Sequence, residues 1–190
     1  IDYADPVLTI EARQTGERLG AEDYEVLVSG GDPEFAWLMP NNEWDAISVN
    51  YTSGTTGDPK GVVYHHRGAC LLAQGNAITA SIPKHAVYLW TLPMFHCNGW
   101  CFPWTLSAVS GTHVCLREVR ADAIWSALDQ YQVTHLCGAP VVMSTILNAE
   151  PEVKRTLQRQ VDFFTAAAPP PKECWPICVK RALTSPISMV

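Results

Sequence analysis

The sequence contains no long apolar run and no recognisable leader. No stretch of about 18 apolar residues occurs, so no transmembrane helix is expected. Residues 1–20 lack both the basic segment and the apolar core of a signal peptide. The chain also lacks an initiating methionine, which suggests that it is a piece of a longer protein.

Basic residues are few. The chain has 13 Lys and Arg against 19 Asp and Glu, a net charge of −6, without a basic patch, which argues against nucleic acid as its main partner. With 190 residues, 47% of them apolar, the composition is that of a globular domain with a real core. The seven cysteines are scattered and odd in number, which favours reduced thiols and an intracellular protein.

The run TSGTTGDPKG, Thr52 to Gly61, carries the strongest chemical signal. Its glycines let the backbone approach a ligand closely, and successive N–H groups in such a turn form an anion site. The four hydroxyl side chains add neutral donors, and Lys60 adds a compact positive charge. We interpret the run as a phosphate-binding loop; the alternative is a plain surface loop.

The residues on each side of this run are typical of strands. The usual nucleotide P-loop needs Gly-x4-Gly-Lys-Ser/Thr at the start of a helix. Here Lys60 is followed by Gly61 and an apolar, β-branched stretch. The loop is therefore predicted to join two strands, Ala46–Tyr51 and Gly61–His65.

A strand–helix rhythm follows the loop and predicts an α/β fold with a mostly parallel sheet and covering helices. Residues 1–45 are irregular, 46–171 form the domain, and 172–190 are a divergent tail without a clear period. Tyr24–Ser29 is predicted as a short strand, and Trp37 and Trp44 are predicted to cover the edge of the core. The expected helices are 67–80, 98–110, 121–131 and 140–148, and the expected strands are 85–92, 112–117, 132–137 and 161–166.

Taken together with further motifs, the loop resembles the signature of the adenylate-forming (AMP-binding) enzymes. These motifs are YHHRGA at 64–69, YLWTLPMFHCNGWCFPW at 88–104, VTHLCGAPVV at 133–142 and VDFFTAAAPPP at 161–171. The resemblance covers roughly residues 30–172 and is closest to the short- and medium-chain acyl-activating enzymes of plant peroxisomes and bacteria. It implies part of the family's large N-terminal α/β domain, with the small C-terminal domain absent.

The resemblance also implies an activity. The family joins a carboxylic acid to ATP as an acyl-adenylate and passes the acyl group to CoA, with Mg²⁺ bridging the phosphates. The residues then expected at the β and γ phosphates are Thr52, Ser53, Gly54, Thr55, Thr56, Gly57 and Lys60. Ala167 and Ala168 match the segment beside adenine, although the family usually has Gly where this chain has Ala167, which puts that contact in doubt.

Five residues match the acid side of the family site: His96, Asn98, Gly99, Trp100 and Gly138. By resemblance, the ring of His96 lies beside the acyl-adenylate at a catalytic position, with no direct proton transfer implied. Trp100 is bulky and would favour a short or aromatic acid; its alternative role is core packing. Zinc binding by His96, Cys97 and Cys101 is not favoured, because their spacing is not a usual zinc pattern.

Several family segments are absent from the 190 residues. These are a Tyr-Gly-x-Thr-Glu segment, an Asp for the ribose and the Lys of the mobile domain. Because such groups act as a unit, the chain alone is not expected to be active. The alternatives are a truncated, non-catalytic product that at most binds nucleotide, and an amino-acid or luciferin activator. The location is expected to be cytoplasmic or peroxisomal, and the oligomeric state stays open.

Overall fold

A computed structural model describes residues 24–52, 57–165 and 187–189. The chain divides into two compact units, residues 1–39 and 40–190. The described part of the first unit contains the short helix α2, Tyr24–Ser29. No helix among the described residues is long and apolar enough to cross a membrane.

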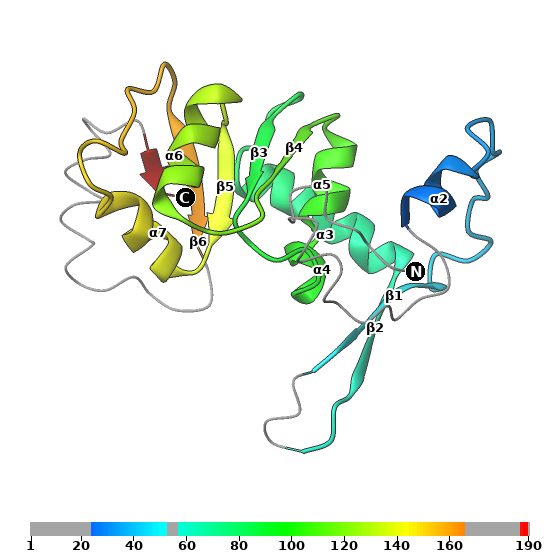
Figure 1. Cartoon of the computed structure of the whole chain (residues 1–190). Coiled ribbons are helices and arrows are strands. Elements are labelled where there is room, and N and C mark those ends of the chain that lie inside the picture. Colours follow the sequence, from blue (N-terminus) through cyan, green and yellow to red (C-terminus); the bar gives the residue numbers. More distant parts are fainter. Residues whose placement is uncertain (1–23, 53–56, 166–186, 190) are drawn as a thin grey trace, which may run out of the picture. The chain divides into compact units, whose positions relative to one another are not determined.

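The second unit begins with an antiparallel hairpin. Strands β1 (Ala46–Tyr51) and β2 (Gly61–His65) pair with each other and with no other described strand. These are the bounds that the sequence predicts, and the candidate phosphate loop joins the two strands. In Figure 1 the hairpin projects away from the larger sheet, next to the start of the following helix.

The larger sheet has five strands in the order β4-β3-β5-β6-β7, and each neighbouring pair is parallel. The fold is therefore α/β with a parallel sheet, as the sequence predicts. The strands of this sheet are β3 (Val87–Trp90), β4 (Thr112–Cys115), β5 (His135–Gly138), β6 (Val161–Thr165) and β7 (Ile187–Met189). The helices are α3 (His66–Thr79), α4 (Cys97–Trp100), α5 (Phe102–Ala108), α6 (Ala121–Gln130) and α7 (Pro140–Leu147).

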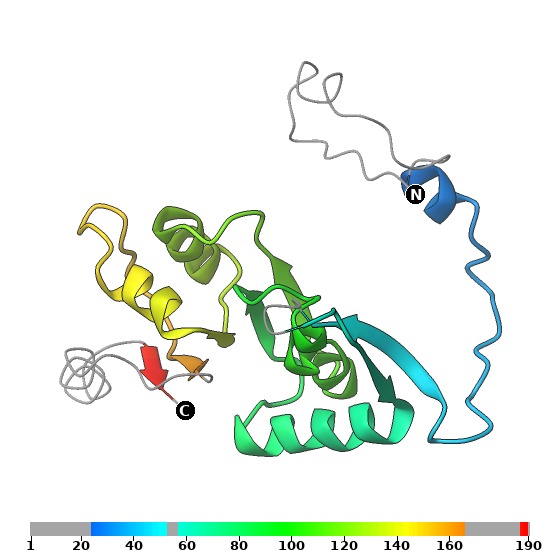
Figure 2. The same cartoon turned by 90° about the horizontal axis from the view of Figure 1, so that it is seen from below.

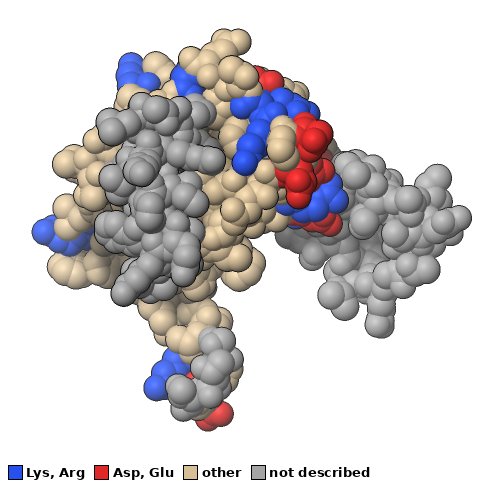
Figure 3. All heavy atoms as spheres, turned by 90° about the vertical axis from the view of Figure 1, so that its left-hand side faces the viewer, with Lys and Arg blue, Asp and Glu red and all other residues tan. Residues whose placement is uncertain are grey.

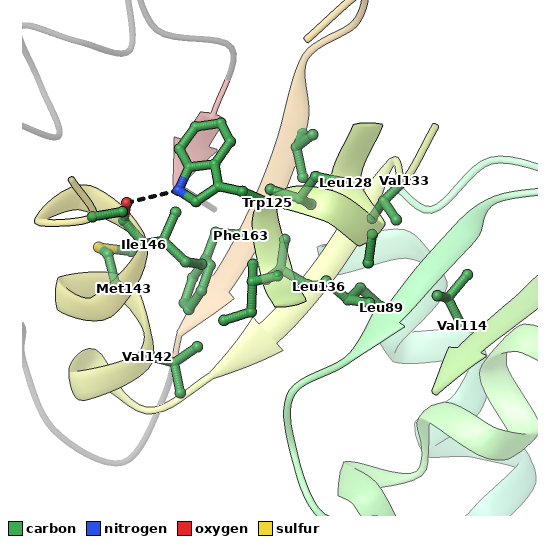
Figure 4. Close-up of a cluster of buried hydrophobic side chains, with 14 residues drawn as sticks. Leu89, Val114, Trp125, Leu128, Val133, Leu136, Val142, Met143, Ile146 and Phe163 are labelled. Carbon is green, nitrogen blue, oxygen red and sulfur yellow. Dashed lines mark hydrogen bonds between the residues drawn. The ribbon is translucent and has the colours of Figure 1, made fainter. Parts of the chain in front are cut away.

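The alternation of side chains along the strands builds two cores, one on each face of the sheet. On one face, Leu89, Leu136 and Phe163 pack under α6 and α7. Figure 4 shows this cluster, in which Trp125 Nε1 donates a hydrogen bond to the Ile146 carbonyl at 3.1 Å.

The opposite face of the sheet is covered by α5 and by the segment that follows α3. The strand side chains Tyr88, Trp90 and Cys137 pack there against Phe102 and Leu106. Helix α3 packs in turn against α5, and Figure 2 shows it running from the hairpin along that helix. Because α3 also begins directly after β2, it connects the hairpin to the sheet.

The structure corrects several predictions outside the sheet core. Tyr24–Ser29 is helical, not a strand, because one helical turn closes its own hydrogen bonds whereas a strand needs a neighbour. Trp44, which lies in the same unit as the sheet, is 62% exposed and does not cover the core. The predicted helix 98–110 is a right-handed helix only from Phe102, because residues 98–101 all have a left-handed φ. Within the predicted tail, Ile187–Met189 forms β7 beside β6.

His135, at the start of β5, gives stability a dependence on pH. Its side chain is only 7% exposed, and its Nε2 lies 3.6 Å from Asp162 Oδ2. Burial lowers the pKa of the imidazole, and the opposing effect of the Asp162 carboxylate is smaller. The unfolded chain therefore binds a proton at His135 more readily than the folded chain does. The contribution of neutral, buried His135 to the free energy of unfolding is present above about pH 6.5 and is lost as the pH falls below that value.

We therefore expect wild-type chain to lose more unfolding free energy between pH 8 and pH 5.5 than a His135→Gln variant. Urea unfolding at the two pH values measures this difference. His85→Asn is the matched control, because His85 is exposed and has a φ of 63°, which Asn tolerates. An equal loss in wild-type chain and His135→Gln would contradict the assignment.

Candidate functional site

The neck of the candidate phosphate loop is closed by two hydrogen bonds. Thr52 N donates to the Lys60 carbonyl, and Lys60 N donates to Thr52 Oγ1, both at 3.0 Å. They extend the β1–β2 pairing one step beyond the Tyr51–Gly61 pair. The Thr52 hydroxyl is thus an acceptor within the neck, and its own hydrogen stays available to a ligand.

Beyond the neck, the described loop residues are a glycine of unusual conformation and exposed residues of both charges. Gly57 has a φ of 154°, a conformation that residues with a side chain rarely adopt. Asp58 and Lys60 are exposed, and Figure 3 shows charged side chains of both signs at the end of the projecting hairpin. The predicted contacts Ser53, Gly54, Thr55 and Thr56 lie outside the described residues.

The second group of predicted residues follows β3 in a left-handed turn. His96 ends the preceding turn, where its N–H donates to the Pro93 carbonyl at 3.1 Å, and its side chain is exposed. The next five residues all have positive φ: Cys97 47°, Asn98 43°, Gly99 54°, Trp100 53° and Cys101 62°. This left-handed turn costs free energy at every residue except glycine, so the surrounding contacts must hold it in place.

Packing against the sheet supplies part of that support at Gly99. A Cβ added there would lie 2.7 Å from the ring of Trp90, closer than non-bonded atoms approach. Glycine is therefore required at this position for two reasons, its positive φ and the close approach of the indole ring. The match of Gly99 to the family site thus has a structural cause within this chain.

Trp100 and Asn98 present different groups from the same turn. The Trp100 carbonyl accepts a hydrogen bond from Asn76 Nδ2 of α3 at 2.8 Å. Its half-buried ring meets Phe164 of β6 edge-on, with 6.5 Å between the centroids. Asn98 Oδ1 is buried and has no hydrogen-bond partner among the described residues. A ligand that carries a hydrogen-bond donor could satisfy this acceptor.

The carboxyl ends of β5 and β6 lie beside each other at the same edge of the sheet. Gly138, the last residue of β5, is buried and pairs with Thr165 of β6. Thr165 Oγ1 is buried and also has no partner among the described residues. Thr165 belongs to the motif at 161–171, whose strand end is predicted by resemblance to lie beside adenine. Ligands of α/β sheets bind at this edge. The predicted contacts Ala167 and Ala168 lie outside the described residues.

The hairpin and the left-handed turn lie close to each other through Tyr64 of β2. Burial raises the pKa of the Tyr64 phenol, and the nearby thiols of Cys97 and Cys101 raise it further. Burial also raises the pKa of the Cys101 thiol, which disfavours the thiolate. No three His, Cys, Asp or Glu side chains gather as metal ligands in the described parts of the chain.

A family model described as AMP-binding enzyme matches residues 5–187, which extends past both ends of the range 30–172. The chain is 52% identical to acetate–CoA ligase CCL3 of Humulus lupulus over 155 residues, 81% of this chain and 27% of that protein. It is also 52% identical to acetate/butyrate–CoA ligase AAE7, peroxisomal, of Arabidopsis thaliana over 153 residues, 80% of this chain and 27% of that protein. The chain thus spans about a quarter of the length of these relatives.

Solved structures give the same fold. The N-terminal domain of FACL13 from Mycobacterium tuberculosis aligns with a TM-score of 0.74 and 22% identity, over 88% of this chain and 42% of that one. O-succinylbenzoate coenzyme A synthetase from Bacillus subtilis, in complex with ATP and magnesium ion, aligns with a TM-score of 0.69 and 21% identity. The alignment covers 85% of this chain and 33% of that one. At these identities the likeness concerns the fold alone.

Proposed function

The chain belongs to the AMP-binding enzyme family, and we propose that it forms the phosphate- and acid-binding part of an ATP-dependent carboxylic acid:CoA ligase. The observation that carries the proposal is the loop Thr52–Lys60, held at its neck between β1 and β2. The names of the relatives, acetate–CoA ligase and acetate/butyrate–CoA ligase, support the type of reaction.

In the proposed reaction, a carboxylate oxygen attacks the α-phosphorus of ATP and pyrophosphate leaves. Both reactants are anionic, so cationic and dipolar groups must offset their repulsion. Lys60 and the backbone N–H groups of the loop would hold the β and γ phosphates, and the free hydroxyl hydrogen of Thr52 would add one donor. CoA thiolate then attacks the acyl carbonyl carbon of the adenylate and displaces AMP.

Mg²⁺ fits this site as an ion that the nucleotide carries. It usually binds through substrate phosphates, waters and one or two carboxylates. The described residues hold no cluster of three ligand side chains that would bind it without nucleotide. When bound, Mg²⁺ would neutralise phosphate charge, while Lys60 and the loop position the phosphates.

We propose that the acid is held at the carboxyl edge of the sheet by the left-handed turn and Gly138. His96 would lie beside the acyl-adenylate, with Asn98 and Gly99 lining the acid. The half-buried Trp100 ring, which meets Phe164 of β6 edge-on, supports this placement. The bulk of Trp100 favours a short, medium-chain or aromatic acid, and the relatives' names point to short ones.

Removing the Trp100 ring is expected to admit longer acids. The assay uses a hybrid in which residues 46–165 of this chain replace the corresponding stretch of the Humulus lupulus acetate–CoA ligase. In Trp100→Ala, the ratio of hexanoate- to acetate-dependent pyrophosphate release should rise by at least about tenfold, because each methylene admitted to an apolar pocket changes kcat/KM by that order. Tyr131→Ala, at an exposed position after α6, is the control. An unchanged ratio would assign Trp100 to packing alone.

The second candidate function is nucleotide binding alone, and the small share of the relatives' length that this chain spans favours it. Because the chain spans about a quarter of its relatives, we propose that the 190 residues alone bind nucleotide without completing adenylation. Carboxylate-dependent ATP–pyrophosphate exchange by the purified chain tests this, and exchange would overturn it. The names of two relatives, which include the word peroxisomal, support the peroxisome among the two expected locations.

A further inference from the structure

The β1–β2 hairpin depends on few contacts for its direction. It forms no hydrogen bonds to the strands of the larger sheet, and an isolated two-stranded hairpin is only marginally stable in water. Its β2 strand borders a cavity of about 290 Å³, lined by Val63, Tyr64, Leu72 and Cys101 among others. On this side, β2 and α3 therefore border an open space in addition to contacting each other.

The base of the hairpin is instead held to the start of α3 by a group of polar and aromatic contacts. Arg67 Nη1 lies 2.7 Å from Glu43 Oε1, and the Arg67 guanidinium carbon lies 5.7 Å from the centroid of the Trp44 ring. The Trp44 ring lies 4.8 Å from the ring of His65. We call Glu43, Trp44, His65 and Arg67 the base clamp.

Two backbone hydrogen bonds join the same segments as the base clamp. Arg67 N donates to the Glu43 carbonyl at 2.8 Å, and His66 N donates to the Asp45 carbonyl at 3.1 Å. His65 ends β2 and also caps α3, because its Nδ1 accepts a hydrogen bond from Gly68 N at 2.9 Å. The base clamp thus joins the entry to β1, the exit of β2 and the first turn of α3.

Exposure argues that the base clamp acts on orientation more than on global stability. The Arg67 and Glu43 side chains are 43% and 55% exposed, and Trp44 is 62% exposed. Exposed ion pairs of this kind add little to the stability of a fold. The guanidinium nevertheless meets both a carboxylate and an indole ring, a combination that fixes its direction.

We propose that Trp44 and Arg67 are positioning residues that hold the phosphate loop at a fixed angle to α3. The other end of α3 holds the left-handed turn through the hydrogen bond from Asn76 to Trp100. Helix α3 therefore sets the distance between the phosphate loop and the acid-binding turn. The base clamp keeps the loop in place by fixing the hairpin to the start of this helix. This inference rests on the proposed function for its role in nucleotide binding, whereas the control of hairpin motion stands apart from it.

The test uses the full chain and two readouts. The variants are Arg67→Met, Trp44→Leu and the conservative Trp44→Phe. Arg120→Met is the matched control, because Arg120 is also exposed and pairs with Glu118 and Asp122 away from the hairpin. Hydrogen exchange reports the motion of the β1–β2 amides, and calorimetry reports the affinity for Mg·ATP.

We expect Arg67→Met and Trp44→Leu to exchange their β1–β2 amides several-fold faster, with unchanged exchange in the five-stranded sheet. We expect them to bind Mg·ATP about tenfold more weakly, since small misplacements of binding groups have effects of this order. Trp44→Phe should restore both values, and Arg120→Met should change neither. Unchanged hairpin exchange in Arg67→Met and Trp44→Leu would overturn the inference, and so would faster exchange throughout the sheet.

The two proposals fail in different ways. If wild-type chain binds no Mg·ATP while the hairpin exchange follows the prediction, the base clamp stands and the nucleotide role of the loop fails. If wild-type chain binds Mg·ATP and the base-clamp variants bind it equally well, the positioning role fails and the nucleotide role stands.

Discussion

Replacing Lys60 with alanine is expected to weaken the binding of Mg·ATP to this chain by at least about tenfold. A hydrogen bond from a charged group to a phosphate is worth roughly 1.5–3 kcal/mol, which corresponds to that change or more. The fold should survive, because the Lys60 side chain is exposed and its backbone bonds to Thr52 remain. Titration calorimetry with Mg·ATP measures the loss.

Lys84→Ala is the matched control for Lys60→Ala. Lys84 is also exposed, and it lies before β3, outside the loop and the turn. The same charge is removed in both variants, so long-range electrostatics affect them similarly. Equal affinities in the Lys60→Ala and Lys84→Ala variants would show that Lys60 does not contact the phosphates.

Replacing Gly99 with alanine is expected to destabilise the fold by about 2–5 kcal/mol. A residue with a side chain costs roughly 1–2 kcal/mol in the left-handed region. Overpacking adds about 1–3 kcal/mol, because the new Cβ would meet the Trp90 ring at 2.7 Å. The free energy of unfolding, from urea denaturation followed by circular dichroism, measures the sum.

Gly75→Ala is the control, because the structure predicts that the same substitution increases the free energy of unfolding at this position. Gly75 lies within α3 and has no atom within 4 Å of an added Cβ. Alanine should stabilise the helix there by about 0.5–1 kcal/mol. A Gly99→Ala variant as stable as Gly75→Ala would mean that the left-handed turn is not held against Trp90 as described.

The sheet was predictable because its strands carry local signals. The short apolar runs around Leu89, Leu136 and Phe163 are bounded by turn residues, and all three side chains are buried. The bounds of the β1–β2 hairpin were also predicted, since β-branched residues flank a Gly-rich loop. Strand ends were less predictable: β5 begins at His135 and not at Gln132, which has a left-handed φ of 52° in the preceding turn.

The left-handed turn was not predictable from local sequence. Residues 98–110 have a composition that suits a helix, with Pro103 near its start. The left-handed turn depends on contacts with residues outside it. Trp90 packs against Gly99, and Asn76 binds the Trp100 carbonyl. Such tertiary contacts override local preference, and no spacing in residues 97–101 reports them.

The candidate site was predictable in its location and less so in its details. The β-branched residues on each side of the run correctly predicted that the candidate phosphate loop joins two strands. It did not show that Thr52 closes the neck of the loop, which follows from the register of the hairpin. Thr165 lies in the motif at 161–171, but the motif does not single out its hydroxyl, which the structure shows to be buried without a described partner.

The base clamp was missed for a related reason. Trp44 was predicted to cover the core, because a large aromatic side chain usually buries its surface. Its actual partners, His65 and Arg67, are next to it only because β1 and β2 pair in antiparallel fashion. Pairing register, not residue type, therefore decides what Trp44 does.

The most direct test of the central claim is acetate-dependent ATP–pyrophosphate exchange by the hybrid that carries residues 46–165. We predict exchange by the hybrid and a loss of at least about tenfold on Lys60→Ala, because the transferred loop then holds the phosphates during adenylation. A folded, soluble hybrid without exchange, or one in which Lys60→Ala changes nothing, would contradict the claim that this chain carries the phosphate-binding part of an acid:CoA ligase.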